Sequence, residues 1–192
     1  MRIFNHHYKS WNEKPEQFHK LWKDAAPWMK DVGKMLEKNH ANKSLFDAGC
    51  GNGILYEYIT TLRNEYFGMD LTMNSINFFR ERFPGVKIMY GDIIDTEMPS
   101  NSSDIVCCFS VLQYIDKEDI DKVLANLFRI AKEYVYLQIP ISEETTEIDR
   151  EGLHIEYNQT EFEEKIKKLG EIIDTTIVDV KRVYLMYTIK KK

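Results

Sequence analysis

Residues 44–53, Ser-Leu-Phe-Asp-Ala-Gly-Cys-Gly-Asn-Gly, combine one carboxylate with three closely spaced glycines. Leu45 and Phe46 are typical of the end of a short buried strand, and a helix is predicted to begin at Ile54. Glycines at alternate positions let the backbone adopt positive φ and let a ligand approach without meeting a Cβ atom. Such a turn between a strand and a helix is typical of the nucleotide-binding corner of a doubly wound α/β sheet.

Two details indicate which nucleotide this corner binds. A dinucleotide fingerprint, G-x-G-x-x-G, needs glycine at position 54, where this chain has Ile54. Asp47 precedes the first glycine by two residues and would repel a pyrophosphate, whereas it would attract a cofactor that carries an ammonium and a sulfonium. The residues therefore favour a cationic nucleoside, and an NAD-dependent oxidoreductase is the disfavoured rival.

The stretch Leu45–Gly53 resembles the first motif of the class I S-adenosylmethionine-dependent methyltransferases. The resemblance implies that S-adenosyl-L-methionine is the cofactor and that methyl transfer occurs by in-line displacement. In such a reaction the protein mainly aligns two partners, and no metal is required. The cofactor contacts that the motif implies are Asp47, Gly49, Cys50, Gly51 and Gly53.

A second acid, Asp70, follows a predicted strand over residues 65–69. An acid at the end of the second strand is well placed to accept hydrogen bonds from both ribose hydroxyls. Leu71 is expected to pack on one face of the adenine. The alternative is that Asp70 caps the next helix, predicted over residues 73–83, although Thr72 and Asn74 are better candidates for that cap.

A third acid, Asp92, follows the predicted strand over residues 86–90. By the resemblance, Asp92 accepts a hydrogen bond from the adenine amino group and the backbone amide of Ile93 meets a ring nitrogen. Asp95 is a competitor for the same role, and an ordinary turn acid is the plainer interpretation of Asp92.

The apolar run over residues 104–109 predicts a central parallel strand, with Cys107 and Cys108 as buried core thiols. The sequence that follows, Ser110 to Ile115, resembles the fourth family motif. The resemblance implies that the Ser110 carbonyl approaches the methionine ammonium of the cofactor and that Gln113 or Tyr114 faces the methyl group.

Residues 141–158 are predicted to form a polar surface loop on the substrate side of the site, before a helix whose capping box begins at Thr160. His154 and Tyr157 are the catalytic candidates in this stretch. His154 is the better candidate for a general base because an unperturbed histidine has a pKa of about 6.5. The alternative is a structural histidine at the junction of loop and helix.

Residues 1–40 have a helical apolar stripe that Pro27 is expected to interrupt. In many small methyltransferases of this type the N-terminal segment folds over the cofactor. By that resemblance Tyr8 and Trp11 line the cofactor site, and the alternatives are ordinary packing or a loose terminus.

The complete pattern predicts one domain over residues 1–192: an N-terminal helical cap (1–40) and a Rossmann-like core (41–192). Its fold class is α/β, with a doubly wound, seven-stranded, mostly parallel sheet. The predicted strands 171–180 and 182–189 would place an antiparallel strand at the C-terminal end.

The composition limits the partners. With 192 residues and a net charge of −5, the chain has no overall basic surface for nucleic acid. No apolar run is near 18 residues, and no signal-peptide pattern is visible, so we expect a cytoplasmic protein without a membrane partner, as a monomer or homodimer. Three cysteines without zinc-site spacing predict neither a disulfide framework nor a metal site.

The acceptor is limited by elimination. DNA amino-methyltransferases carry an Asn/Asp-Pro-Pro-aromatic sequence where this chain has Ser110–Gln113. The paired glutamates of arginine methyltransferases are not evident either. We therefore expect methyl transfer to an oxygen or nitrogen of a small-molecule acceptor. The alternative is a non-catalytic module that binds S-adenosylmethionine or S-adenosylhomocysteine and acts through a partner protein.

Overall fold

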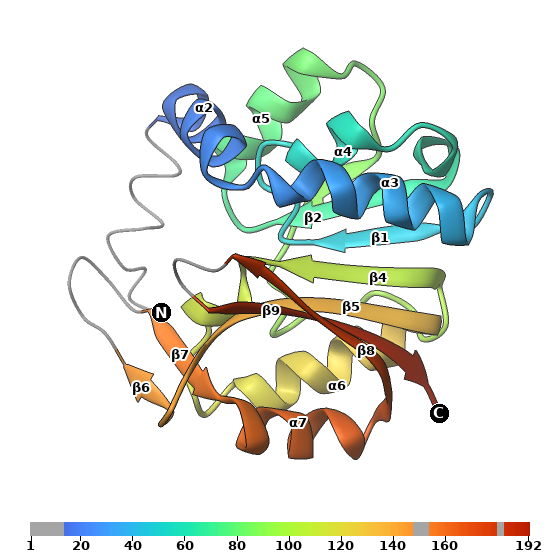
Figure 1. Ribbon diagram of the computed structural model, residues 1–192. Helices are drawn as coiled ribbons and strands as arrows, with labels where there is room; N and C mark the ends of the chain where they lie inside the picture. Colours follow the sequence, from blue (N-terminus) through green and yellow to red (C-terminus); the bar gives the residue numbers. More distant parts are fainter. Residues whose placement is uncertain (1–13, 148–153, 180–182) are drawn as a thin grey trace.

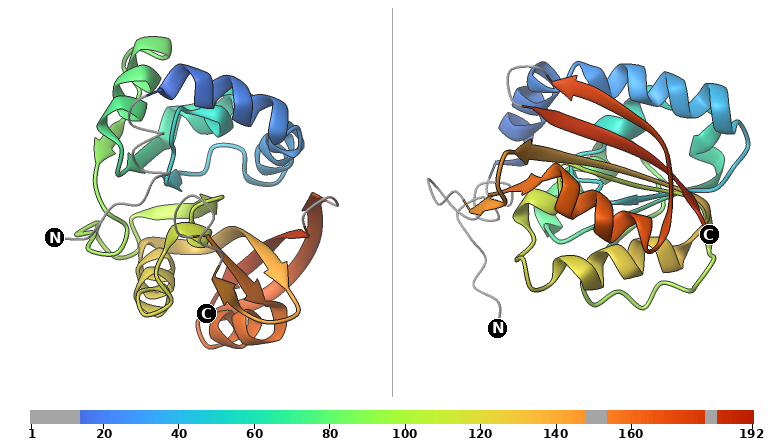
Figure 2. Two further views of the ribbon diagram at one scale, coloured as in Figure 1. Left: turned by 90° about the vertical axis from the view of Figure 1, so that its left-hand side faces the viewer. Right: turned by 60° about the horizontal axis from the view of Figure 1, so that its bottom comes forward.

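The computed structural model describes residues 14–147, 154–179 and 183–192 as one sheet with helices on both faces (Figures 1 and 2). The helices are α2 (Pro15–Ala25), α3 (Trp28–His40), α4 (Ile54–Tyr58), α5 (Met73–Arg82), α6 (Ile120–Ile130) and α7 (Gln159–Lys167). The strands are β1 (Leu45–Ala48), β2 (Tyr66–Asp70), β3 (Ile88–Tyr90), β4 (Ser103–Phe109), β5 (Ala131–Ser142), β6 (Thr146–Glu147), β7 (Ile155–Asn158), β8 (Gly170–Asp179) and β9 (Tyr184–Lys191). Two short 3-10 turns cover Thr61–Glu65 and Leu112–Tyr114.

The main sheet has the strand order β3-β2-β1-β4-β5-β9-β8. Strands β1 to β5 are parallel, and β9 runs antiparallel to both of its neighbours. This arrangement confirms the predicted doubly wound sheet. Its order reverses between β1 and β4, and ligands of such sheets bind beyond the carboxyl ends of the strands at that point.

Helices α2 to α5 cover one face of the sheet, and α6 and α7 cover the other (Figure 1). Strand β4 is buried on both faces: Ile105, Cys107 and Phe109 join the core under α3 and α5, whereas Val106 and Cys108 join the core over α6. Residues 105–109 of this central parallel strand are accordingly all apolar. Both thiols are free and buried, and burial raises the pKa of each, so the prediction of core thiols is confirmed.

The N-terminal helices divide where the sequence predicts. Pro27 separates α2 from α3 and stands at the N-cap position of α3 with φ −60°. The buried side of α3 includes Met29, Val32 and Leu36, which pack in the core on this face of the sheet. Helix α3 is thus part of the core and not only a cap over it.

The helix that is predicted to begin at Ile54 does begin there, but it is short. Helix α4 ends at Tyr58, and a 3-10 turn follows over Thr61–Glu65. The carboxylate of Glu37, on α3, accepts hydrogen bonds from the backbone N–H groups of residues 60–62. A cap supplied by another helix satisfies N–H groups that a continuous helix would use internally.

The prediction of a loop over residues 141–158 is wrong in part. Strand β5 extends to Ser142, and β7 pairs in parallel with its end, Ile141 opposite Tyr157. Strand β6 pairs with β7 in turn. The side chains of Ile155 and Tyr157 are buried, with Glu156 between them more exposed, an alternation too short to stand out among polar residues.

The predicted start of helix α7 is also corrected. Helix α7 is capped by Asn158, whose side chain accepts a hydrogen bond from the N–H of Glu161 at 3.1 Å, and not by Thr160. Helix α6 has Asp119 at its N-cap position, because Asp116 begins a separate turn closed by the N–H of Asp119. Helix boundaries commonly shift in this way when several capping residues lie close together.

Candidate functional site

The glycine turn lies beyond the carboxyl end of β1, and its shape requires glycine. Gly49, Gly51 and Gly53 have φ values of 81°, 49° and 79°. A Cβ atom at Gly49 would lie 2.2 Å from a methyl carbon of Val111. The N–H of Gly49 donates to the Met69 carbonyl of β2 at 2.8 Å, which holds the turn against the sheet. The turn therefore has a fixed position between β2 and the segment after β4.

Asp70 braces this turn from the end of β2. One carboxylate oxygen accepts the N–H of Gly51 at 2.8 Å, and the other accepts the N–H of Thr72 at 2.8 Å and its hydroxyl. Burial raises the pKa of Asp70, and these hydrogen bonds oppose the rise. Asp70, which is predicted to bind the ribose, lies at the end of β2 as expected. Its carboxylate oxygens already accept most of their possible hydrogen bonds from the protein itself.

Asp47 is buried, with 4% of its surface exposed, and accepts a hydrogen bond from the Tyr66 hydroxyl at 2.8 Å. Burial raises the pKa of Asp47 to about 7 against the effect of the Tyr66 hydrogen bond, and the Asp70 charge adds to the rise. A cation beside this carboxyl favours its ionised form. The site thus contains a carboxyl whose charge depends on what lies next to it.

The segment after β4 has two unusual features. Ser110 has a positive φ of 56°, and its N–H and hydroxyl both donate to Oε1 of Gln138, each at 2.8 Å. Gln113 is fully buried, and neither end of its amide has a hydrogen-bond partner within the described residues. A buried amide without partners is costly, and such groups are typical of binding sites.

Asp92 and Ile93 lie in the turn after β3. Asp92 accepts the N–H of Ile94 at 2.9 Å, and Ile93 is buried, with its carbonyl accepting a hydrogen bond from Asn126 on α6. Asp95 instead points to solvent and pairs with a lysine of α6. Asp92 can stabilise the turn and also bind the adenine amino group, because one carboxylate accepts several hydrogen bonds.

The two catalytic candidates have different surroundings. His154 is half-buried and its ring meets that of Tyr114 edge-on, with 5.9 Å between centroids. This contact brings His154 to the segment after β4. Tyr157 is buried, and its hydroxyl donates to the Leu112 carbonyl at 3.0 Å. Tyr157 therefore supports that segment from below, and His154 is the stronger of the two candidates.

The N-terminal helix α2 is connected to the glycine turn. Nδ2 of Asn52 donates to the Pro15 carbonyl at 2.6 Å, and Arg82 donates to the Asn52 carbonyl at 2.9 Å. His19 lies 3.0 Å from Glu57, and burial together with Arg82 and a neighbouring lysine lowers the pKa of His19 to about 4. Nδ1 of His19 lies 3.1 Å from the Arg82 guanidinium, and a neutral His19 accepts a hydrogen bond there. The predicted cap residues Tyr8 and Trp11 lie outside the described residues.

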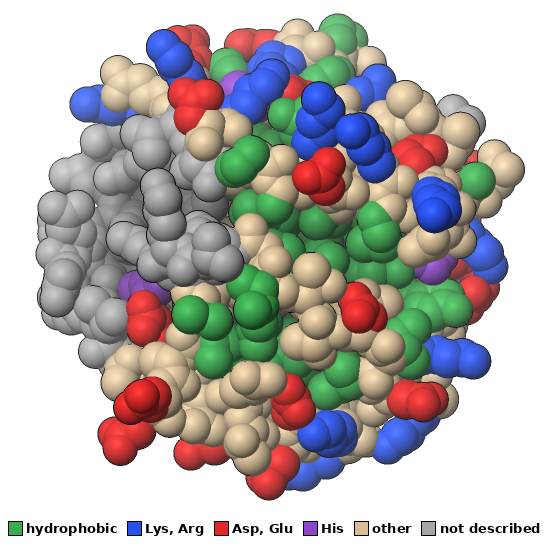
Figure 3. Space-filling view, viewed as in Figure 1, with side chains coloured by type: hydrophobic (Ala, Val, Ile, Leu, Met, Phe, Trp, Pro, Cys, Tyr) green, Lys and Arg blue, Asp and Glu red, His purple; other side chains and the backbone are tan. Residues whose placement is uncertain are grey.

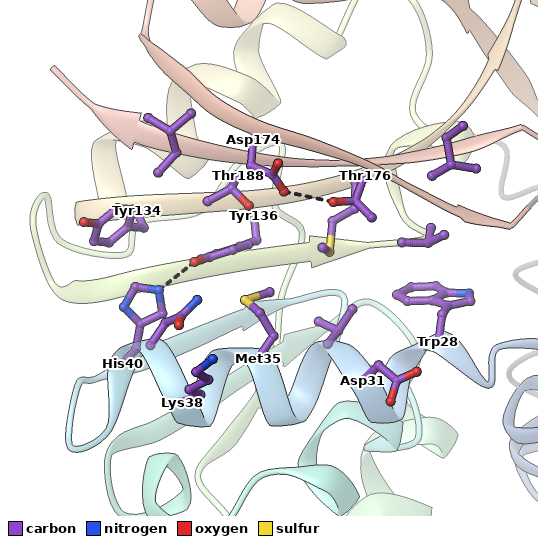
Figure 4. Close-up of a pocket in the computed structure, with 16 residues that line it drawn as sticks. Trp28, Asp31, Met35, Lys38, His40, Tyr134, Tyr136, Asp174, Thr176 and Thr188 are labelled. Carbon is purple, nitrogen blue, oxygen red and sulfur yellow. Dashed lines mark hydrogen bonds between the residues drawn. The ribbon is translucent and has the colours of Figure 1, made fainter.

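A separate groove of about 990 Å³ lies between α3 and strands β5, β8 and β9 (Figure 4). Apolar side chains gather in this hollow between the upper helices and the sheet (Figure 3). Trp28 stands at one end of the groove and the hydrogen-bonded pair His40 and Tyr136 at the other. Of the predicted site residues that the structure describes, none lines the groove.

Comparison with known proteins connects this geometry to a family. Residues 46–139 match the methyltransferase domain family. A probable S-adenosylmethionine-dependent methyltransferase of Mycolicibacterium smegmatis is 26% identical over 101 residues, 53% of this chain and 38% of that protein. The ubiquinone biosynthesis O-methyltransferase of Cupriavidus pinatubonensis is 27% identical over 130 residues, 65% of this chain and 50% of that protein.

The fold is similar to that of the 1,6-didemethyltoxoflavin-N1-methyltransferase of Burkholderia thailandensis, with a TM-score of 0.74 at 15% identity. That similarity covers 100% of this chain and 92% of the other. The chain belongs to the class I S-adenosylmethionine-dependent methyltransferases. S-adenosyl-L-methionine is the cofactor of that family. The matched region spans at most half the length of the two relatives named above.

The residues of the methyltransferase fit such a cofactor. Asp47 is a buried carboxyl suited to a cationic neighbour, and the amide of Gln113 has a donor and an acceptor to offer. A Cβ at Gly51 would meet no atom of the described residues within 4 Å, so this part of the turn is open toward a ligand. Within the described ranges, no group of three His, Cys, Asp or Glu is placed to hold a metal ion. Of the described helices, none has the length and apolarity to cross a membrane.

Three residues that hydrogen-bond to predicted site residues are not indicated as site residues by the sequence: Tyr66, Thr72 and Gln138. The sequence indicates Thr72 only as a helix cap. Gln138 does carry a signal, because it is a polar residue within the apolar run of β5, between Leu137 and Ile139. A polar residue in a fully buried strand needs a hydrogen-bond partner, which for Gln138 is Ser110.

Proposed function

We propose that this methyltransferase transfers a methyl group from S-adenosyl-L-methionine to an oxygen or nitrogen atom of a small-molecule acceptor. The observation that carries the proposal is the glycine turn held between two buried carboxyls, Asp47 and Asp70, at the carboxyl ends of β1 and β2. The ubiquinone biosynthesis O-methyltransferase among the relatives and the N1-methyltransferase among the similar structures support an oxygen or nitrogen acceptor.

The cofactor supplies, when bound, an electrophilic methyl carbon on a sulfonium. Asp47 attracts its positive charge, Asp70 accepts from the ribose, and Asp92 with Ile93 holds the adenine while Leu71 packs on it. The glycine turn, with Cys50, gives the backbone room to approach. The protein's contribution is therefore alignment and a carboxyl of opposite charge in a site of low polarity.

The segment after β4 forms the acceptor side of the site in this proposal. The Ser110 carbonyl accepts from the methionine ammonium, and Gln113 faces the transferred methyl group. His154 takes the proton that the acceptor oxygen or nitrogen loses as it gains the methyl group. Tyr157 holds the Leu112 carbonyl and keeps this segment in place.

The first test is calorimetric titration of the wild-type protein and of Asp70→Ala with S-adenosylmethionine, S-adenosylhomocysteine and NAD. Loss of a charged hydrogen-bonding partner should weaken adenosyl binding by about 1.5–3 kcal/mol. Asp104→Ala is the matched control, because Asp104 also accepts a backbone N–H, that of Ser44 at 2.8 Å, but at the amino end of β4. It should lose stability and keep its affinity.

A second measurement separates the enzyme from a non-catalytic module. Transfer of labelled methyl from S-adenosylmethionine is followed on a panel of small hydroxyl and amine acceptors. Turnover of one of these acceptors by the wild type, with loss of that turnover in Asp70→Ala, supports the proposal. Tight NAD binding, or the absence of adenosyl binding in the wild type, contradicts it. Adenosyl binding without turnover on any acceptor favours the binding module.

A further inference from the structure

Ser110 has a backbone conformation that its residue type does not favour. Among the described non-glycine residues, three have positive φ: Asn42, Asn101 and Ser110. Asparagine enters the left-handed region readily, whereas other residues with a Cβ atom do so at a cost of about 1–2 kcal/mol. A serine at φ 56° therefore needs neighbouring contacts that hold it there.

Gln138 makes those contacts. It lies on β5 directly beside Phe109 of β4, the residue before Ser110, and only 1% of its surface is exposed. A single oxygen, Oε1, accepts both the N–H and the hydroxyl of Ser110 at 2.8 Å. Because both donors belong to one residue, the pair of bonds fixes the orientation of Ser110 and not merely its distance from β5.

We propose that Gln138 is a positioning residue of the methyltransferase: it holds the left-handed turn at Ser110 and so sets the orientation of the segment that faces the cofactor. The inference rests on the proposed function, which places the Ser110 carbonyl and the Gln113 amide in the site. Gln138 itself touches neither cofactor nor acceptor in this scheme. It acts through Ser110.

The alternative is that Gln138 is a buried polar residue of β5 that matters only for stability. The two roles differ in what relieves the loss of Gln138. Glycine adopts positive φ without strain. If the function of Gln138 is to hold Ser110 in this conformation, replacement of Ser110 by glycine removes much of the need for Gln138. A purely structural Gln138 would show no such dependence.

The experiment is a double-mutant cycle of Gln138→Met and Ser110→Gly, read as equilibrium affinity for S-adenosylhomocysteine and S-adenosylmethionine. We expect Gln138→Met to weaken both affinities about tenfold in the otherwise wild-type chain, the loss of a buried hydrogen-bonding partner. In the Ser110→Gly background the same change should have an effect of about threefold or less. The difference between the two effects is the coupling that the inference requires.

Tyr136→Phe is the matched control. Tyr136 is on the same strand, and its hydroxyl shares a buried hydrogen bond with His40 at 2.6 Å, remote from Ser110. This variant should lose stability and keep both affinities. If it weakens binding as much as Gln138→Met does, the effect of Gln138 follows from stability alone and the inference is overturned.

Hydrogen exchange of the Ser110 N–H in the ligand-free protein gives a readout that needs no cofactor. Protection of this amide should fall in Gln138→Met and stay unchanged in Tyr136→Phe. Unchanged protection, or equal affinity losses in both Ser110 backgrounds, overturns the inference. If the wild type binds neither adenosyl ligand, the proposed function is refuted. The hydrogen-exchange measurement still tests the role of Gln138 in that case, so the two failures are distinguishable.

Discussion

Replacement of Gln113 by methionine should stabilise the fold while it damages the site. Methionine has a similar unbranched length and no polar atoms, so it fills the same space without unsatisfied groups. Gln113 is fully buried, and both polar atoms of its amide lack partners within the described residues. Each unsatisfied buried group costs about 1–3 kcal/mol, which methionine does not incur.

The expected gain in the free energy of unfolding is therefore about 1–3 kcal/mol. For a domain of this size each kcal/mol raises Tm by about 2–4 °C, so Tm should rise by roughly 2–12 °C. If the Gln113 amide hydrogen-bonds the cofactor or the acceptor, the same variant should lose about tenfold in kcat/KM. The two assays are calorimetric unfolding of the ligand-free protein and initial rates of methyl transfer.

Two further variants serve as controls. Gln138→Met makes the same substitution at an amide oxygen that has two partners, so its Tm should fall. Tyr187→Phe removes another buried group that has no partner among the described residues, the hydroxyl of Tyr187 on β9, whose ring is separated from that of Tyr157 by Phe162. Its Tm should hold or rise with no change in rate. A fall of Tm in Gln113→Met would refute the reasoning, because it would mean that the amide is satisfied in the folded protein.

Two other predictions concern Asp47 and the catalytic candidates. Because burial raises the pKa of Asp47 to about 7, affinity for S-adenosylmethionine should rise up to tenfold per pH unit between pH 5 and 7, then level off; in Asp47→Asn this slope should vanish. Affinity rises with pH because the carboxyl is protonated in the free site and ionised beside the cation. Titration with S-adenosylmethionine at several pH values checks this dependence. His154→Gln should lower kcat at least tenfold and leave cofactor affinity unchanged, whereas Tyr157→Phe, which loses a bond to the Leu112 carbonyl, should lower the free energy of unfolding by about 1 kcal/mol with a smaller effect on kcat. Equal kinetic losses in the two variants would contradict the distinction.

The parts of the fold that the sequence predicts well are those set by local pattern. The glycine turn, the acids Asp47 and Asp70, and the apolar run of β4 each depend on residues close together in the chain. Strand β2 ends at Asp70, within one residue of the predicted end of that strand. Parallel strands then bring their carboxyl ends to one edge without further information.

The parts that the sequence does not predict depend on pairs of distant residues. Glu37 ends helix α4 through contacts with residues 60–62, and nothing near those residues indicates that a carboxylate from another helix will meet them. Gln138 meets Ser110 because β4 and β5 are neighbours in the sheet, 28 positions apart along the chain. Such contacts follow from the fold, and no local sequence pattern indicates them.

Three local rules are broken where β1 and β4 end. Ser110 takes a left-handed conformation, Gln113 buries an amide without partners, and Asp47 buries a carboxyl whose pKa rises to about 7. Each of these features costs stability in the ligand-free protein. The cost at Ser110 is offset by the two hydrogen bonds to Gln138, that at Gln113 by a hydrogen-bonding ligand, and that at Asp47 by a neighbouring cation. Sequences retain such costs mainly at functional sites. A ligand that is both cationic and rich in hydrogen-bonding groups would relieve the second and third together, which is why the carboxyl edge of this sheet, and not the apolar groove beside α3, is the place to look for catalysis.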